Sequence, residues 1–249
     1  MMNDKHLTNY LLVSEEDIKN EFKFDICIVI EELNKLSFDF YISGGVIGKF
    51  FLKEHARYTK DIDIVTGYDL KEVERIFREH FDVSIFVSCP ITDEYYEEAF
   101  ICLIELNGKT IQIDGMKVDF FSEIKPDIYK INDISFIGVP FEYLLATKIH
   151  ALIIEIERPF KHLVDVYSAS LLNESLIDKE EIKRYLSVYN EYENKIRKIM
   201  KQREESLRFS IEKNKTFSGP TYLTILQAGH NVSKEKMIEE VNKYLSTFK

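Results

Sequence analysis

Residues 43–64 read SGGVIGKFFLKEHARYTKDIDI and contain a glycine pair followed by two aspartates one residue apart. Asp61 and Asp63 belong to a run of β-branched residues, DIDIVT, that is typical of a strand. Side chains two residues apart on a strand point to the same face, so the two carboxylates are expected side by side. Two like charges at such a short distance repel each other unless a cation lies between them. The segment therefore predicts a site for Mg²⁺ or Mn²⁺, because Mg²⁺ prefers carboxylate oxygens.

The glycine pair before this strand suits the same purpose. A backbone without Cβ atoms can approach a phosphate closely and offer its N–H groups as donors. A short helix predicted over 46–54 would direct its positive end to the same place. Ser43, Gly44 and Gly45 are thus candidate contacts for the phosphates of a nucleoside triphosphate. Alone, each feature also fits an ordinary turn or a pair of surface acids, so the prediction rests on their combination.

A third carboxylate is expected from a later strand. Three β-like runs are separated by Asn107-Gly108 and Asp114-Gly115, dipeptides that favour tight hairpin turns because they tolerate positive φ. The runs span 99–106, 109–113 and 116–121, which predicts an antiparallel meander. Its last strand places Asp119 between two apolar residues. If that strand lies beside DIDIVT, Asp61, Asp63 and Asp119 could together hold two metal ions for in-line nucleotidyl transfer.

The remaining pattern divides the chain into a mixed α/β region and a helical region. Predicted helices cover 15–36, 46–54, 69–80, 141–156, 160–172, 178–212 and 233–247, and further strands cover 38–43 and 83–88. The apolar pattern breaks near 173–178. We therefore predict two domains, 1–174 and 175–249.

The composition narrows the classes of protein to which the chain could belong. The 249 residues are 45% hydrophobic, enough for real cores. No apolar stretch is long enough to span a membrane, and the N-terminus lacks a signal-peptide pattern, so a cytoplasmic protein is expected. The three cysteines form neither a zinc nor a disulfide pattern. With a net charge of -10, the chain could bind nucleic acid only through a local basic patch or a bound cation.

These residues resemble the polymerase-β-like nucleotidyltransferases, which carry a Gly-Gly or Gly-Ser turn, a D-x-D pair and a third Asp on a separate strand. Within that superfamily the chain is most similar to the AbiEii/AbiGii-type toxin family. The family's R-x-T-x-D-x-D run is matched by Arg57, Thr59, Asp61 and Asp63. Its later helical segment is matched in ATKIHALIIEIERPFKHLVDVYSA at Lys148, Ala151, Leu152, Arg158, Lys161 and Asp165. The resemblance covers roughly residues 40–170 and departs from the family at Val46 and His162.

The resemblance implies an α+β nucleotidyltransferase domain with a mixed sheet, followed by a C-terminal helical bundle. It also implies transfer of a nucleoside monophosphate to RNA, such as tRNA, or to protein, and a cognate antitoxin as partner. Lys148 would contact the triphosphate, and Asp165 would orient Lys148 or Arg158 unless it serves a structural ion pair. Arg57 and Thr59 would either order the loop before the strand or touch phosphate.

Two other functions share these motifs. One is a nucleotidyltransferase that modifies a small molecule such as an antibiotic, and the other is a catalytically silent module that binds a nucleotide or a partner.

His150 is predicted to pack or face solvent rather than to act in catalysis, because it lies off the helix face of Lys148.

A basic stripe in the predicted helix 178–212 is the candidate surface for an RNA backbone. Arg197, Lys201 and Arg208 share one helix face, with Lys198 beside them. A solvated helix face explains the same pattern.

Overall fold

The structure, a computed structural model, describes residues 25–56, 61–89, 98–154, 159–173, 176–200, 230 and 232–248. It groups into two compact units, Met1–Phe141 and Glu142–Lys249. This division lies upstream of the boundary predicted at 174/175. The helices between the two positions group with the C-terminal unit because they pack on helices that follow them in the chain, as described below.

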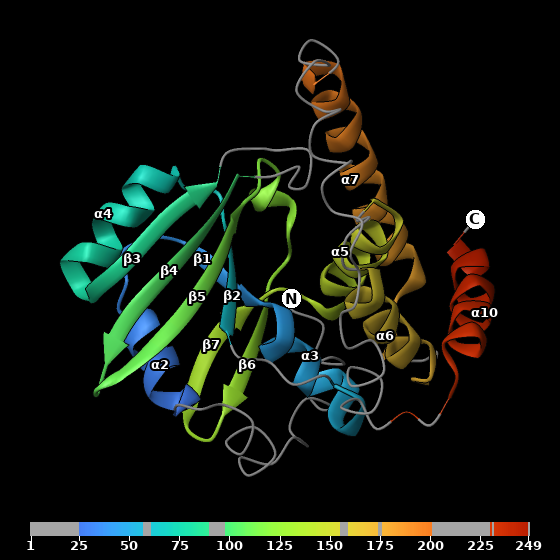
Figure 1. Cartoon of the computed structure of the whole chain (residues 1–249), viewed down its shortest axis with the longest axis horizontal. Coiled ribbons are helices and arrows are strands. Elements are labelled where there is room, and N and C mark those ends of the chain that lie inside the picture. Colours follow the sequence, from blue (N-terminus) through green and yellow to red (C-terminus); the bar gives the residue numbers. More distant parts are fainter. Residues whose placement is uncertain are drawn as a thin grey trace, which may run out of the picture. The chain divides into compact units, whose positions relative to one another are not determined.

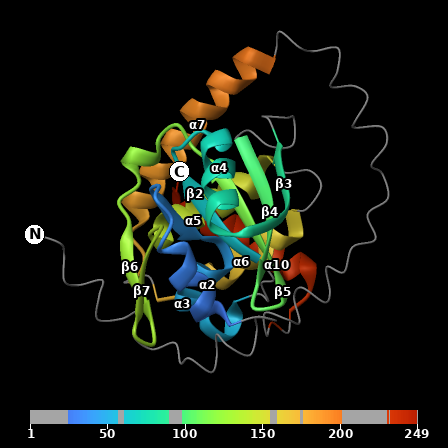
Figure 2. The same cartoon turned by 90° about the vertical axis from the view of Figure 1, so that its left-hand side faces the viewer.

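The first unit is built on one seven-stranded mixed sheet (Figure 1), which confirms the predicted α/β class. Its strands are β1 Phe40–Ser43, β2 Asp61–Thr66, β3 Asp82–Cys89, β4 Glu98–Leu106, β5 Lys109–Lys117, β6 Asp127–Ile131 and β7 Ile134–Gly138. They lie in the order β3-β4-β5-β2-β1-β7-β6, so β3 and β6 form opposite edges of the sheet (Figure 2). The pairs β2–β5 and β1–β7 are parallel and the others are antiparallel.

Short helices connect and cover these strands. They are α2 Ile26–Leu33, α3 Gly44–Leu52, α4 Leu70–His80 and the 3₁₀ turns η2 Lys53–His55 and η3 Phe121–Glu123. The start of α4 was predicted from Asp69, whose carboxylate accepts the Lys71 N–H at 2.9 Å and so caps the helix. Of the helix predicted over 15–36, the structure describes only the part from residue 25, which contains α2.

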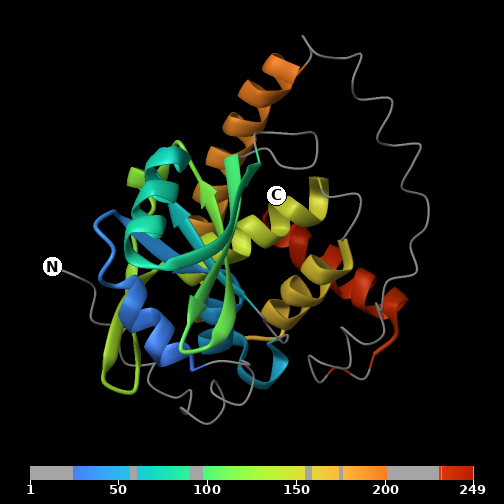
Figure 3. The same cartoon turned by 60° about the vertical axis from the view of Figure 1, so that its left-hand side comes forward.

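The two faces of the sheet differ in what covers them. On one face, α4 packs along β3 and β4 (Figure 3), and Phe77 of α4 contacts Phe86 and Phe100 of these strands. Phe86 and Phe100 stack with ring centroids 5.0 Å apart. The opposite face carries Asp61 and Asp63. Phe77, Phe86 and Phe100 therefore pack on the face of the sheet opposite to the one that carries the acids.

The first of the two predicted hairpin turns is confirmed and the second is wrong. Asn107 and Gly108 have φ of 52° and 72° and join β4 to β5 directly. Asp114 and Gly115 instead lie inside β5, which continues to Lys117. A Cβ at Gly115 would come within 2.0 Å of the Phe100 ring, so this glycine provides space for the ring that lies across from it. Residues 98–117 therefore form the two-stranded hairpin β4–β5 instead of the three strands predicted over 99–121.

A second hairpin, β6–β7, was absent from the sequence-based prediction. Its turn contains Asn132 at a φ of 56°, and Tyr129 and Phe136 stack across it at 5.5 Å. The Tyr129 hydroxyl donates to the Val139 carbonyl at 2.7 Å. The sequence signal for this hairpin is the pair of β-rich runs DIYKI and ISFIG on either side of the polar dipeptide Asn132-Asp133.

The second unit is helical, as predicted for the C-terminal region. Its helices are α5 Phe141–Ile154, α6 Pro159–Ser170, α7 Lys179–Met200 and α10 Lys234–Leu245. The Tyr189 hydroxyl of α7 donates to the Tyr143 hydroxyl of α5 at 2.7 Å. Ser168 of α6 and His230, which precedes α10, form a buried hydrogen bond of 2.7 Å. None of the helices in the described part of the chain is long and apolar enough to cross a membrane.

Candidate functional site

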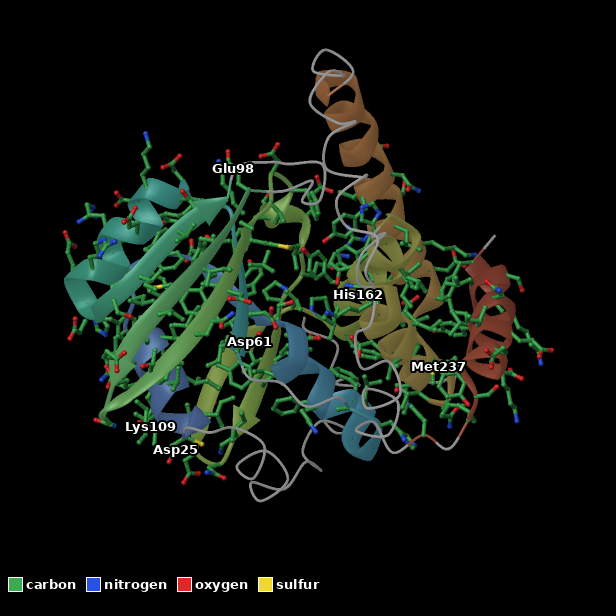
Figure 4. All side chains as sticks on the ribbon, viewed as in Figure 1. Asp25, Asp61, Glu98, Lys109, His162 and Met237 are labelled. Atoms are coloured by element: carbon green, nitrogen blue, oxygen red, sulfur yellow. The ribbon has the colours of Figure 1, made fainter. Side chains whose placement is uncertain are left out.

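Asp61 and Asp63 lie on the same face of β2, as the alternation of the sequence predicts. Between and after them, Ile62 and Ile64 are 0% and 1% exposed and point into the core on the opposite face. Both carboxylates are partly buried, and Figure 4 shows Asp61 on β2 near the centre of the sheet. Core packing of the isoleucines therefore fixes the direction of both acids.

The glycine turn packs directly against Asp63. Gly44 has a φ of +61°, and a Cβ added there would lie 1.6 Å from Asp63 Oδ2. The Gly45 N–H donates to the same oxygen at 3.4 Å, and Ser43 is the strand neighbour of Asp63. Only glycine satisfies both the left-handed backbone and this close approach. The turn positions Asp63 in the structure, while a contact of Ser43, Gly44 or Gly45 with phosphate stays a prediction.

The third acid beside this pair is Asp114 rather than Asp119. Strand β5 runs parallel to β2 with Asp63 opposite Asp114 and Asp61 opposite Gln112. Asp119 lies in a turn after the end of β5, between the buried residues Val118 and Phe120, and is exposed. The prediction that Asp119 lies on a strand beside DIDIVT is therefore wrong. The reason is that β5 continues through Gly115 instead of turning there.

Asp114 could have been found from the sequence by its alternation. Ile111 and Ile113 are 2% and 0% exposed, while Gln112 and Asp114 between and after them are only partly buried. This is the same period of two that placed Asp61 and Asp63 on one face. The turn preference of Asp114-Gly115 concealed it, because that preference predicts the end of a strand at the position of the acid.

Asp61, Asp63 and Asp114 lie on one face of the sheet, on the adjacent strands β2 and β5. Adjacent strands in a sheet are about 4.8 Å apart, so Asp63 and Asp114 are close neighbours. The Gln112 amide donates to Asp114 Oδ1 at 2.8 Å, and the Gly45 N–H is directed at Asp63. A cation bound between these acids would offset their mutual repulsion.

The residue types in this group suit a hard divalent ion. Carboxylate oxygens are the usual protein ligands of Mg²⁺, which also takes substrate phosphates and water. Within the described residues, no three His, Cys, Asp or Glu side chains are already gathered around one point as metal ligands. The fit to a metal therefore rests on the strand register and on the close packing of Asp63 against Gly44.

Lys148 and Asp165 pair within the helical unit. The ammonium of Lys148 on α5 lies 3.9 Å from Asp165 Oδ2 on α6, and the two side chains are 18% and 10% exposed. The sequence-based expectation was that Asp165 orients Lys148 or Arg158, or forms a structural ion pair. The structure brings Asp165 to Lys148, while Arg158 lies outside the described residues.

Two histidines near this pair are buried. His150 is 9% exposed and stacks on Tyr189 with centroids 4.8 Å apart, so its predicted packing role is confirmed. His162, one of the two departures from the AbiEii/AbiGii pattern, is also 9% exposed. Val46, the other departure, is buried in α3.

Several predicted contacts lie outside the described residues. They include Arg57 and Thr59 before β2, and Lys201 and Arg208 of the basic stripe. Arg197 and Lys198 belong to α7, but the positions of their side chains are not described. The roles expected for these six residues and for Lys161 stay predictions.

No protein-family model matches the chain, and no curated protein is significantly similar to it in sequence. Among solved structures, it is similar to JHP933 from Helicobacter pylori, with a TM-score of 0.43 and 12% identity over 94% of this chain and 95% of that one. A second solved structure, described as a nucleotidyltransferase from H. pylori, also gives a TM-score of 0.43 and 12% identity, over 95% of this chain and 99% of that one. An antigenic nucleotidyltransferase-like protein from Paracoccidioides brasiliensis gives a TM-score of 0.43 and 14% identity, over 76% of this chain and 94% of that one. Likeness this distant carries no functional argument, so the proposal below rests on the geometry of the acidic face.

Proposed function

We propose that the chain is a divalent-metal-dependent nucleotidyltransferase, which moves a nucleoside monophosphate from a nucleoside triphosphate to an acceptor. One observation carries most of the proposal. Asp63 and Asp114 are paired positions of the parallel strands β2 and β5, and Asp61 lies two residues earlier on the same face. Three carboxylates on one face of a sheet suit Mg²⁺ or Mn²⁺.

Two of the three acids have their own structural support. Asp63 is held by the Gly45 N–H and by close contact with Gly44, and Asp114 is held by Gln112. The buried side chains behind β2 and β5 keep the two strands in register. Groups fixed in this way need little rearrangement when charge develops during a reaction, which is the main source of electrostatic catalysis.

In the proposed reaction, an acceptor hydroxyl oxygen attacks the α-phosphorus of the triphosphate. The bond from that phosphorus to the β-phosphate oxygen breaks, pyrophosphate leaves, and the hydroxyl proton is released to water. The metal ions, when bound, would lower the pKa of the attacking hydroxyl and neutralise the leaving pyrophosphate. The role of Asp61, Asp63 and Asp114 is to hold those ions at fixed positions.

The finer proposal follows the AbiEii/AbiGii-type resemblance. We propose a toxin-like enzyme in which Lys148, oriented by Asp165, contacts a substrate phosphate. The 3.9 Å ion pair supports this assignment, because a lysine with a fixed direction can act as a point charge for phosphate. RNA such as tRNA, or protein, is the proposed acceptor, and an antitoxin is the proposed partner. A small-molecule acceptor such as an antibiotic is the alternative.

Asp63→Ala tests the proposal, with Asp133→Ala as the control because Asp133 is an exposed turn acid. Each variant is incubated with labelled nucleoside triphosphates and Mg²⁺ or Mn²⁺, and separate pools of RNA, protein and small molecules serve as acceptors. We expect Asp63→Ala to reduce label transfer at least about 100-fold, and Asp133→Ala to behave as wild type. Urea unfolding checks that both variants fold.

Direct metal binding separates an enzyme from a silent module. Titration of the wild type with Mn²⁺, followed by the electron paramagnetic resonance of the free ion, is expected to reveal binding that Asp63→Ala loses. Binding without transfer in any pool would favour the silent module. Equal transfer by wild type and Asp63→Ala would defeat the nucleotidyltransferase proposal.

A further inference from the structure

The two edges of the sheet differ in charge. Among the described strands, β3 pairs only with β4 and so presents its other edge outward. From Val83 to Ser88 this edge strand has no charged residue. The opposite edge, β6, contains Asp127 and Lys130. Charged residues on an edge strand discourage pairing with another chain. In β3 the one charged residue is Asp82 at its first position, and residues 83–88 have none.

The outward side chains of β3 are apolar and exposed. Ile85 and Val87 are 47% and 50% exposed, and Ile101 of the neighbouring strand is 42% exposed. Val87 is opposite Ile101, and Ile101 is opposite Asp114. Ile85 is two residues before Val87 on the same strand, so Ile85, Val87 and Ile101 all lie on the face of the sheet that carries the acids. Apolar residues at the open end of a sheet are a ready template for a further strand.

The order of residues in β3 is symmetric about Phe86. The segment reads Ser84, Ile85, Phe86, Val87, Ser88, with a β-branched residue on each side of the phenylalanine and a serine beyond each. In antiparallel pairing of the strand with its own copy, Ile85 would face Val87 of the second copy, Phe86 would face Phe86, and Ser84 would face Ser88. Residues directly opposite one another lie on the same face, so apolar side chains meet apolar ones and serines meet serines.

We propose that two copies of the chain associate through β3, antiparallel and with Phe86 at the two-fold axis, to form one continuous sheet. A second copy fits better than a different partner because the strand complements itself, as an isologous interface requires. Charge supports the same choice. Each copy has a net charge of -10, so copies repel each other over most of their surface, and the uncharged edge is where they can approach.

The register shift between Val83 and Ile85 in the β3–β4 pair sets the length of the contact. An irregularity of this kind bends an edge strand and ends regular pairing there. The regular ladder therefore begins at Ile85, and the contact is centred on residues 85–87.

The pairing has a consequence for the acidic site, although it does not depend on the proposed reaction. A two-fold axis perpendicular to the sheet places both acidic faces on the same side. Five strand spacings separate β5 from its copy, which corresponds to about 24 Å between the two Asp114 positions. Ile85, Val87 and Ile101 of both copies would form an apolar floor between the two sites.

Val87→Lys tests the interface in the full chain, and Ile128→Lys is its matched control. Ile128 lies on the other edge strand and is 51% exposed, almost the same as Val87. We expect sedimentation velocity across the micromolar range to show a dimer for wild type and Ile128→Lys. Val87→Lys should raise the dimer dissociation constant at least about 100-fold, because each dimer would place two lysines against apolar side chains. A monomeric wild type, or equal behaviour of the two variants, would overturn the proposal.

Disulfide cross-linking tests the register in a Cys89→Ser background. Opposite residues in antiparallel strands have Cα atoms about 4.5–5.5 Å apart, within the range of a disulfide. A mixture of Ile85→Cys and Val87→Cys chains should therefore give an oxidised heterodimer, while neither variant should cross-link by itself. Cys102 does not interfere, since it is buried and burial raises the pKa of its thiol to about 12. Cross-linking of Val87→Cys alone would contradict the register centred on Phe86.

Discussion

Two dipeptides with the same local preference, Asn107-Gly108 and Asp114-Gly115, have opposite structures in this protein. The first forms the two-residue turn between β4 and β5, with both residues at positive φ. The second continues a strand that is paired on both sides, with β4 and with β2. At Gly108 an added Cβ would meet nothing within 4 Å, whereas at Gly115 it would meet the Phe100 ring at 2.0 Å.

The comparison shows that glycine serves two different purposes here. Gly108 is used for its backbone conformation, and Gly115 for its lack of a side chain beneath a buried ring. An aromatic ring packed over a glycine across a strand pair is a known way to stabilise a sheet. Because β5 does not turn at Gly115, it runs beside β2 and brings Asp114 next to Asp63. The candidate site therefore depends on which of the two purposes prevails at this glycine.

The largest expected effect distinguishes the acid inside the strand from the acid beyond its end. Asp114→Asn should reduce nucleotidyl transfer about 100- to 1,000-fold, because the amide still accepts from Gln112 but no longer carries the charge. Asp119→Asn should leave the rate within about twofold, since a surface change away from a site has little effect. Initial rates with labelled triphosphate measure both. A greater loss of activity in Asp119→Asn than in Asp114→Asn would identify Asp119 as the third carboxylate of the site.

The next effect concerns stability at the glycine inside the strand. Gly115→Ala should lower the free energy of unfolding by about 3 kcal/mol, because the new methyl group overpacks the Phe100 ring. Urea unfolding measures this change. The double variant Gly115→Ala/Phe100→Leu should recover part of the loss, since residues in contact are not additive. Additive losses would show that the ring is not the cause.

A smaller effect is expected at the glycine of the turn. Gly108→Ala should cost about 1 kcal/mol, because an L-residue is forced into the left-handed region without any steric clash. The same unfolding assay compares it with Gly115→Ala. If Gly108→Ala proved the more costly of the two, the assignment of the two glycine roles would be reversed.

The smallest effect tests whether β5 continues beyond Gly115. Lys117 and Glu98 are the last paired residues of β5 and β4. The Lys117 Nζ donates a hydrogen bond to Glu98 Oε2 at 2.9 Å, and this bond raises the pKa of Lys117. A raised pKa means that the folded state favours the charged lysine. The stabilisation is therefore present at neutral pH and disappears as the pH rises through the raised value.

Lys117→Met should accordingly cost about 0.5 kcal/mol at pH 7, as expected for a partly exposed ion pair. The difference from wild type should shrink as the pH rises above 10.5, the ordinary value for lysine. Unfolding measured across this pH range provides the test. A difference that does not change with pH would mean that the pair contributes nothing.

Much of the first unit could be predicted from short-range patterns. The alternation in DIDIVT indicated one face for Asp61 and Asp63, and Asp69 indicated the start of α4. The turn at Asn107-Gly108 followed from its backbone preference. The turn expected at Asp114-Gly115 was wrong because a contact with Phe100, fifteen positions earlier in the chain, outweighs the preference of the dipeptide. The β6–β7 hairpin was missed because exposed isoleucines, Ile128 and Ile137, interrupt the alternation of polar and apolar residues.

Local chemistry within the chain was sufficient to define the acid pair, the glycine turn before it and most element types, because these depend on neighbours a few residues away. The order of the strands and the parallel pairing of β2 with β5 depend on contacts between distant residues, and so does the identity of the third acid. Such contacts are formed by packing, as where Phe100 lies over Gly115 in the strand that carries Asp114 beside Asp63.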